Sequence, residues 1–309
     1  MKKLLSVGID VSKDTLDVCL LSKNDSRNLQ VTNNRKGMNS LKQKLQEIDS
    51  IPIVIEATGG YHYDITFFLQ EKGFQVFVIN PLITKRYLQS SIRKVKTDKA
   101  DALILARIGV NEALSLYTET KLEVLRKKKV RLLHFYQKKS QEISTKISNS
   151  KNVGLFDSIE LESLQRIKKS YQQEILHVKK ELVKSLELIP QKIRGVSEVN
   201  HKAIAIELGN LKRFSNKRQI VAFAGLDPSI KESGTSVKGR SRLSKRGSKT
   251  LRHFLYQSAW GVMMHNPKYK KFYDKKRTEG KHYFTCLSAV ARKLLCQIYF
   301  ELKEDYIKG

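Results

Sequence analysis

The stretch from residue 119 to residue 187 contains no proline and a single glycine, Gly154. Apolar residues recur three and four positions apart within it, between lysine-rich runs. This spacing predicts two long amphipathic helices, with a break near residues 150–157. A narrow apolar stripe is unstable alone, so we expect a coiled-coil hairpin or an oligomer contact. The stripe comprises Leu125, Leu132, Leu133, Phe135, Leu161, Leu164, Ile167, Ile175, Val178 and Leu182.

The segment before these helices alternates between short apolar runs and helical patterns. This order predicts an α/β layer with a mixed sheet. In chain order we expect strands at 4–10, 15–21 and 28–32, a helix containing Leu41, Leu45 and Ile48, a strand ending at Glu56, a helix at 63–72, a strand at 73–80 and a helix at 97–110 capped by Thr97.

The segment after Pro190 is mostly helical by the same criteria. An exception lies between Gly225 and Gly247, where the chain is polar, basic and too long for a simple connector. We therefore predict three domains: an α/β domain at 1–115, coiled-coil assembly helices at 116–189 and a mainly α-helical domain at 190–309. The helices expected in the last domain are 201–208, 215–224, 251–264 and 284–302.

The chain is strongly basic, with 59 Lys and Arg against 30 Asp and Glu among 309 residues, a formal charge of +29. Such an excess favours a polyanionic partner, with nucleic acid ahead of an anionic membrane. No apolar run approaches the ~20 residues of a membrane span. No signal peptide is visible, and Cys19, Cys286 and Cys296 fit free or buried thiols, so we expect a cytoplasmic, nucleoid-associated protein. The seven His residues lack ligand spacing, which argues against structural zinc.

Acidic residues stand out in this basic chain at a few positions. Asp10 and Glu56 each end a predicted strand, and Asp98 and Asp101 share one face of a predicted helix. Strand ends and a neighbouring helix can converge at one edge of an α/β sheet, where gathered carboxylates need a cation between them. Oxygen ligands of this kind suit Mg²⁺ or Mn²⁺, which can act on a phosphodiester.

Each of these acids also has an ordinary structural explanation. Asp10 could be a turn residue, and Asp98 and Asp101 could be first-turn acids favoured by the helix dipole. Glu56 is harder to explain, because it follows a buried apolar strand and needs a partner. The four together favour a metal site. As candidate metal ligands, Asp14 and Asp17 rank below Asp10.

The loop at residues 225–247 is the second candidate site. It could simply grip phosphates, or it could carry a serine nucleophile with cations stabilising a phosphoryl group. No His lies in the loop to act as a base. Its hydroxyls are Ser233, Thr235, Ser236, Ser241 and Ser244, and its candidate nucleic-acid-binding cations are Lys231, Lys238, Arg240, Arg242, Lys245 and Arg246.

These motifs, in this order, resemble a known family. "GIDVSKDTLDV", "IEATGGY", "VINP", "KTDKADALILA" and "FAGLDPSIKESGTSVKGRSRLSKRG" look like the DEDD-type insertion-sequence transposases, relatives of the Piv DNA invertase that are also known as bridge-RNA-guided recombinases. The resemblance covers nearly the whole chain. It implies a RuvC-like, RNase H-like first domain whose metal-binding tetrad falls on Asp10, Glu56, Asp98 and Asp101.

The resemblance further implies a nucleophilic serine, here Ser233, that attacks a DNA phosphate to give a phosphoserine linkage and a free 3′ hydroxyl. It implies an active site composed from different subunits of a dimer or tetramer, and a non-coding bridge RNA that pairs with donor and target DNA. One departure is "IRGVSEV", where Arg194 and Ser197 replace the proline and second glycine of the family's turn beside Gly195. We therefore expect the backbone of that turn to bind phosphate less well than in the family.

The sequence therefore indicates a DNA transposase or recombinase. The alternatives are a Piv-like invertase without a guide RNA, a RuvC-like metal-dependent nuclease that uses water, and a basic nucleic-acid-binding protein without catalysis. The acids retained in a basic chain count against the last.

Overall fold

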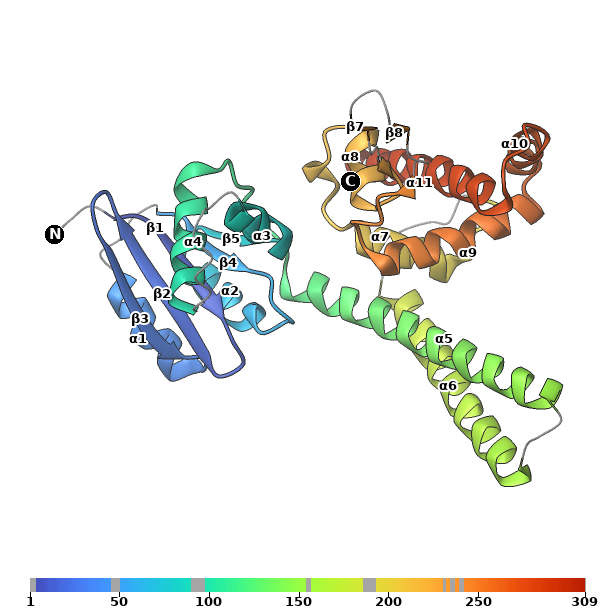
Figure 1. The fold of residues 1–309 in the computed structure, drawn as a ribbon, viewed down its shortest axis with the longest axis horizontal. Helices are drawn as coiled ribbons and strands as arrows, with labels where there is room; N and C mark the ends of the chain where they lie inside the picture. Colours follow the sequence, from blue (N-terminus) through green and yellow to red (C-terminus); the bar gives the residue numbers. More distant parts are fainter. Residues whose placement is uncertain are drawn as a thin grey trace. The chain divides into compact units, whose positions relative to one another are not determined.

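The computed structural model describes residues 4–45, 51–89, 98–153, 157–185, 193–229, 232–233, 237–238 and 242–308. The chain separates into two compact units, Met1–Thr118 and Glu119–Gly309. Both are visible in Figure 1, the first in blue to teal and the second in green to red. Ile48 and Thr97, which entered the predictions above, lie outside the described residues.

The first unit is the predicted α/β layer, and its five-stranded sheet is mixed. The strand order is β3-β2-β1-β4-β5; the first three strands pair antiparallel, and β1, β4 and β5 pair in parallel. A helix missing from the prediction, α3, follows the last strand. The elements are β1 (Leu4–Val11), β2 (Thr15–Ser22), β3 (Ser26–Thr32), α1 (Arg35–Leu45), β4 (Ile53–Glu56), α2 (His62–Glu71), β5 (Val76–Ile79), α3 (Pro81–Gln89) and α4 (Asp98–Asn111).

The two faces of this sheet carry different helices. Ile9 and Ile55 pack with residues of α1 and α2, such as Leu41 and Phe68, in one apolar cluster. On the opposite face, Val54 packs with Leu105 and Ile108 of α4, while Cys19 packs with Ala102 and Ala106. Because neighbouring strand residues point to opposite faces, β1, β2 and β4 are mostly buried on both sides, whereas the edge strand β3 is largely exposed.

The predicted long helices are α5 (Lys121–Val153) and α6 (Ser158–Lys184), which begin the second unit. They form an antiparallel hairpin, seen in green in Figure 1. Lys129 pairs with Glu181, and Lys146 with Glu160, so early residues of α5 face late residues of α6. Asp157 caps α6 by accepting a hydrogen bond from the Ile159 amide at 3.2 Å, which stabilises the start of that helix.

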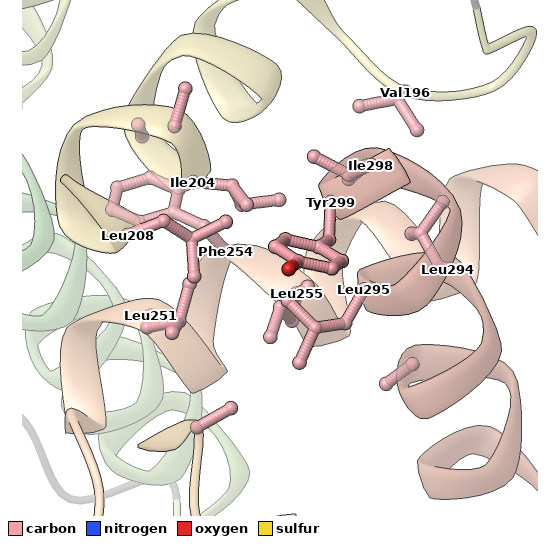
Figure 2. Packing of buried hydrophobic residues seen from close by; sticks show 14 of the residues in the cluster. Val196, Ile204, Leu208, Leu251, Phe254, Leu255, Leu294, Leu295, Ile298 and Tyr299 are labelled. Carbon is pink, nitrogen blue, oxygen red and sulfur yellow. The ribbon is translucent and has the colours of Figure 1, made fainter. Parts of the chain in front are cut away.

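The remaining chain folds into a helical body around one core. Figure 2 shows Leu255 beside Tyr299 and Leu295, and Leu251 and Phe254 near Leu208, all in one core. Tyr299 is buried but its hydroxyl donates to the Phe214 carbonyl at 3.1 Å, which satisfies it. Helix α10 was not predicted. The helices are α7 (Glu198–Leu208), η1 (Leu211–Arg213), α8 (Lys217–Phe223), α9 (Lys249–His265), α10 (Pro267–Thr278) and α11 (Tyr283–Lys308).

The apolar stripe predicted for the two long helices is buried in part and exposed in part. Leu133 of α5 and Leu182 of α6 are buried in the core of the second unit. Leu125, Leu132 and Phe135 remain exposed on α5. Of the described helices, none combines the length and apolar character that crossing a membrane requires.

Candidate functional site

Asp10 and Glu56 end two adjacent parallel strands of the first unit. β1 and β4 pair with Ile9 opposite Ile55, so the next residues, Asp10 and Glu56, lie at the same level. Both side chains are partly buried. In open α/β sheets, ligands bind outside the carboxyl ends of the strands, which is where these two acids are placed.

Helix α4 lies directly on β1, and two glycines make the contact possible. A Cβ at Gly8 would lie 2.0 Å from the Ala102 carbonyl oxygen and 2.4 Å from the Ala106 nitrogen. A Cβ at Gly109 would lie 2.3 Å from Ser6 Oγ. Rising numbers along α4 therefore match falling numbers along β1, so the helix runs antiparallel to the strand. Its first turn extends toward the strand end that carries Asp10.

The two strand-end acids point to the face that α4 covers. Gly8 faces α4, so Asp10, two residues later on β1, faces the same way. Val54 contacts the Gly109 position, which places Glu56 on that face by the same alternation. The acids of two strands and the first turn of one helix thus belong to one end of one face.

Asp98 and Asp101 lie in that first turn. Asp98 is the first residue of α4, but its side chain is outside the described set. Asp101 is partly buried, and its Oδ1 atom is shielded from solvent. The backbone thus places both acids at the end of the helix nearest Asp10.

The donor types at this end are suited to a hard cation. All are carboxylate oxygens, which Mg²⁺ and Mn²⁺ prefer over nitrogen or sulfur ligands. Among the described side chains, which do not include that of Asp98, no three or more His, Cys, Asp or Glu gather as metal ligands would. The four acids fit an oxygen-ligated divalent cation by donor type and by backbone placement.

Asp17 is an acid that the sequence interpretation ranked low. It lies opposite Asp10 in the β1–β2 ladder and is only 6% exposed. Gln30 Nε2 donates a hydrogen bond to Asp17 Oδ1 at 3.0 Å. A hollow of about 240 Å³ beside it is lined by both residues and by Ala102 of α4. The sequence feature that could have identified Asp17 is its position in a strand between two apolar residues, Leu16 and Val18.

Ser233 lies in the second unit, on a β-hairpin formed by the polar loop. Strands β6 (Pro228–Ser229) and β9 (Arg242–Leu243) pair at its base, and β7 (Glu232–Ser233) pairs with β8 (Val237–Lys238) beyond them. Ser233 is opposite Val237, as the last paired residue before the tip. The backbone of Ser233 is therefore at one end of the β7–β8 ladder; its side chain is outside the described set.

The base of the hairpin is fixed to the helical body. A Cβ at Gly247 would lie 1.8 Å from the Phe223 carbonyl oxygen, so the backbones touch there. Arg252 Nη1 donates to the carbonyls of Ala224 at 3.0 Å and Gly247 at 2.8 Å, and burial lowers the Arg252 pKa. Rigid support of this kind suits a loop that positions a functional side chain.

The other loop residues separate into distinct roles. Ser244 donates its hydroxyl to Asp227 Oδ1 in a short hydrogen bond, which makes it a structural residue of the hairpin base. Lys245 and Arg246 are exposed at that base. Lys238 and Arg242 have described backbones only, and Lys231, Thr235, Ser236, Arg240 and Ser241 lie outside the described residues.

The turn that departs from the family pattern packs tightly. Gly195 has φ +94°, and a Cβ there would lie 2.6 Å from the Gly261 carbonyl oxygen of α9. Ser197 caps α7 by accepting from the Asn200 amide at 3.2 Å. The serine that replaces the family's second glycine therefore has a structural role at the helix start.

Two family models match this chain, and together they cover parts of both units. Residues 7–152 match a family model described as a DEDD-type IS110 transposase, and residues 189–274 match the transposase model of the IS116/IS110/IS902 family. The chain is thus a DNA-rearranging enzyme of the transposase class. It belongs to the IS110 family of insertion-sequence transposases.

Relatives of two kinds are similar to this chain. The pilin gene-inverting proteins of Moraxella bovis and Moraxella lacunata are 27% and 26% identical, each over 97% of this chain and 96% of the relative. The insertion element IS110 43.6 kDa protein of Streptomyces coelicolor is 26% identical over 36% of this chain and 27% of that protein. The similarity thus spans inverting proteins and insertion-element proteins.

Proposed function

We propose that this protein cuts and rejoins DNA through Ser233, with the four acids binding the divalent metal that the reaction needs. The observation that carries the proposal is the antiparallel contact of α4 with β1, which directs the acids of three separate segments to one end of the sheet. A RuvC-like role for this unit follows from the same placement.

Asp10, Glu56, Asp98 and Asp101 would hold Mg²⁺ or Mn²⁺. When bound, such an ion polarises a phosphodiester oxygen and stabilises charge on the phosphoryl group. Glu56 and Asp10 contribute rigid strand-end positions, while α4 contributes the remaining carboxylates from its first turn.

The covalent step belongs to Ser233. Its hydroxyl oxygen loses its proton and attacks a DNA phosphorus, which forms a phosphoserine bond. The bond from phosphorus to the 3′ oxygen breaks, and that oxygen takes up a proton to become a free 3′ hydroxyl. The reverse attack by a 3′ hydroxyl rejoins the strand and restores serine, so the bond energy is conserved. The cations of the hairpin, such as Lys245 and Arg246, bind flanking phosphates.

Assembly into a dimer or tetramer would bring acids and serine of different subunits together. Support comes from the exposed apolar residues of α5, where Leu125 is 54% and Phe135 48% exposed. An apolar stripe of this kind favours burial against a helix of a second copy, as in a coiled coil. Ser233 and the acids lie in different units of one chain, which fits a shared site.

Guidance by a non-coding bridge RNA is the finer part of the proposal. The net charge of +29 suits a protein that holds RNA as well as donor and target DNA. The alternative is an invertase without RNA, favoured by the pilin gene-inverting proteins that match over the whole chain. Co-expression with the DNA that flanks the gene separates these: a specific co-purified RNA supports guidance, and random host RNA supports the invertase.

The decisive experiment follows the covalent step. DNA from the flanks of the gene is incubated with protein and Mg²⁺, then boiled in detergent and separated by electrophoresis. Wild type should retain a DNA adduct, while Ser233→Ala should bind DNA but form none. Glu56→Gln, which keeps shape and removes charge, should also form none. If Ser233→Ala cuts and rejoins normally, the nucleophile is water or another serine, and the nuclease alternative gains.

A further inference from the structure

Helix α10 and its turn into α11 form a strongly basic segment outside the serine hairpin. Residues 267–281 contain seven Lys and Arg against Asp274 and Glu279. The proposed recombination chemistry assigns no role to this segment. We define it, together with His282 and the first two residues of α11, Tyr283 and Phe284, as the α10–α11 corner.

One side of α10 is anchored to the helical body. Tyr269 is 1% exposed, and its hydroxyl donates to Gln297 Oε1 at 2.7 Å. Lys293 of α11 lies over the Phe272 ring at 4.5 Å. Since Tyr269 and Phe272 are three apart, they define the inward face of the helix.

The other side of α10 is a cationic surface. Its exposed cations are Lys268, Lys270, Lys271, Lys275 and Arg277. In the described part of the chain, none of these five side chains forms an ion pair, although Glu279 pairs with the neighbouring Lys276 and with Lys281 at 2.8 Å. Their charge is therefore available to an anionic ligand.

An exposed aromatic ring adjoins this cationic surface. Phe284, in the first turn of α11, is 65% exposed. Its ring stacks on His282 with centroids 5.9 Å apart and meets Tyr283 edge-on at 5.2 Å. Tyr283 in turn packs edge-on against Tyr273 of α10, with centroids 6.2 Å apart. The ring thus has two aromatic neighbours while most of the residue stays exposed to solvent.

The turn between the helices holds the ring and the cations in a fixed relation. Arg277 Nη1 donates to the Lys281 carbonyl at 2.7 Å across the turn. Gly280 has φ +73°, a backbone conformation that suits glycine. The ion pairs of Glu279 with Lys276 and Lys281 close the same turn.

We propose that the α10–α11 corner binds an unpaired stretch of nucleic acid, with phosphates on the α10 cations and a base stacked on Phe284. This rests on the proposed function, because a DNA-rearranging enzyme handles displaced or single strands. Every base has a stacking face, but in a duplex that face is covered by its neighbours. A cationic surface with an open aromatic ring is therefore selective for unpaired strands.

The chemistry of the corner favours nucleic acid over an anionic membrane. Membrane-surface helices bury a continuous apolar face opposite their cations. The apolar residues of α10, Tyr269 and Phe272 among them, are already packed in the protein. The corner offers one exposed phenyl ring, Phe284, which is enough for one base.

A tryptophan at the ring position reports stacking directly. Trp260 is the only tryptophan in the sequence. A protein with Trp260→Phe and Phe284→Trp therefore has its tryptophan fluorescence from the corner alone. Titration with unpaired oligothymidylate or oligouridylate should quench this signal, whereas a duplex of equal length should quench it much less. Tighter binding of RNA would identify a structural RNA as the source, and tighter binding of DNA a displaced strand; either supports the proposal.

Substitutions test how much the Phe284 ring and the α10 cations each contribute to nucleic-acid binding. In the wild-type background, Phe284→Ala should weaken single-strand binding about fivefold to a hundredfold and leave duplex binding nearly unchanged. Lys270→Gln with Lys271→Gln should weaken both and reduce the salt dependence by about two counterions. Phe300→Ala, which removes another exposed ring of α11, is the matched control and should change neither.

Specific outcomes would overturn the proposal. These are no quenching by single strands, equal losses for single strand and duplex in Phe284→Ala, or quenching by vesicles of anionic lipid at least as strong as by oligonucleotide. The proposed recombination function fails separately, through absence of a DNA adduct in wild type. That result leaves the fluorescence measurement intact, so the two failures are distinguishable.

Discussion

Replacement of Gly8 by alanine tests the contact on which the acidic site depends. The added Cβ would lie 2.0 Å from the Ala102 carbonyl oxygen, and distances under 3.0 Å are essentially never seen for real Cβ atoms. Helix α4 must therefore retreat from β1 by about 1 Å. Both close atoms belong to the backbone, so no side-chain rotation can relieve the conflict.

The cost follows from the packing beneath α4. A gap of about 0.5–1 Å forfeits a quarter to a half of each van der Waals well. Leu105 and Ile108 are essentially fully buried there, each contributing about 1.5–3 kcal/mol. Gly8→Ala should therefore lower the free energy of unfolding of the first unit by about 1–3 kcal/mol. Displacing two carboxylates by about 1 Å should also reduce adduct formation about a hundredfold.

Urea unfolding followed by circular dichroism measures the first effect. Trp260 lies in the second unit, so its fluorescence transition should stay unchanged and serves as an internal control. Gly109→Ala is the matched variant, because its Cβ would meet a side-chain atom, Ser6 Oγ. Adding Ser6→Ala should recover part of its loss. A Gly8→Ala protein within about 0.5 kcal/mol of wild type and fully active would refute the reasoning.

Three further outcomes concern the second unit. Burial, and then the charge of His134, lower the pKa of His253 to about 4, below its ordinary 6.5, so the unfolded chain takes up its proton first. Stability should then fall as pH drops from 6.5 toward 4, by about 1 kcal/mol at pH 5 after allowing for partial exposure, and His253→Gln should flatten that slope in unfolding curves. Tyr299→Phe removes the bond to the Phe214 carbonyl and should cost about 1–2 kcal/mol of unfolding free energy by denaturant titration. Arg252→Lys cannot bridge both carbonyls at the hairpin base and should cost about 1–2 kcal/mol with faster hydrogen exchange there, whereas unchanged exchange would contradict the anchoring role.

Local patterns were sufficient to predict much of this fold. The strand-end positions of Asp10 and Glu56 and the two long helices follow from hydrophobic period and from the placement of glycine and proline. Helix α10 was missed because its inward residues, such as Tyr269 and Phe272, are few among lysines and give no clear apolar stripe. Gly8 was also missed, since a glycine within a strand does not indicate which helix will approach it.

The register of α4 on β1 has a consequence for the proposed metal site. Carboxylates brought to one end of the sheet repel one another; at about 5 Å the repulsion is roughly 3 kcal/mol per pair in an effective dielectric of about 20. The backbone approach at Gly8 holds this end of α4 on β1 through a contact that does not involve the carboxylates. A bound cation would remove the repulsion, so the first unit should gain stability with Mg²⁺.

That gain can be measured without any catalysis. At a Mg²⁺ concentration a hundred times the dissociation constant, binding only to the folded state adds about 2.7 kcal/mol. Thermal unfolding of the first unit should shift upward with Mg²⁺ in wild type, and Glu56→Gln should lose most of the shift because one ligand is gone. Gly8→Ala should lose part of it, since the acids remain but their spacing changes. Equal midpoints with and without Mg²⁺ in wild type would count against the site, and an undiminished shift in Glu56→Gln would place the ion elsewhere.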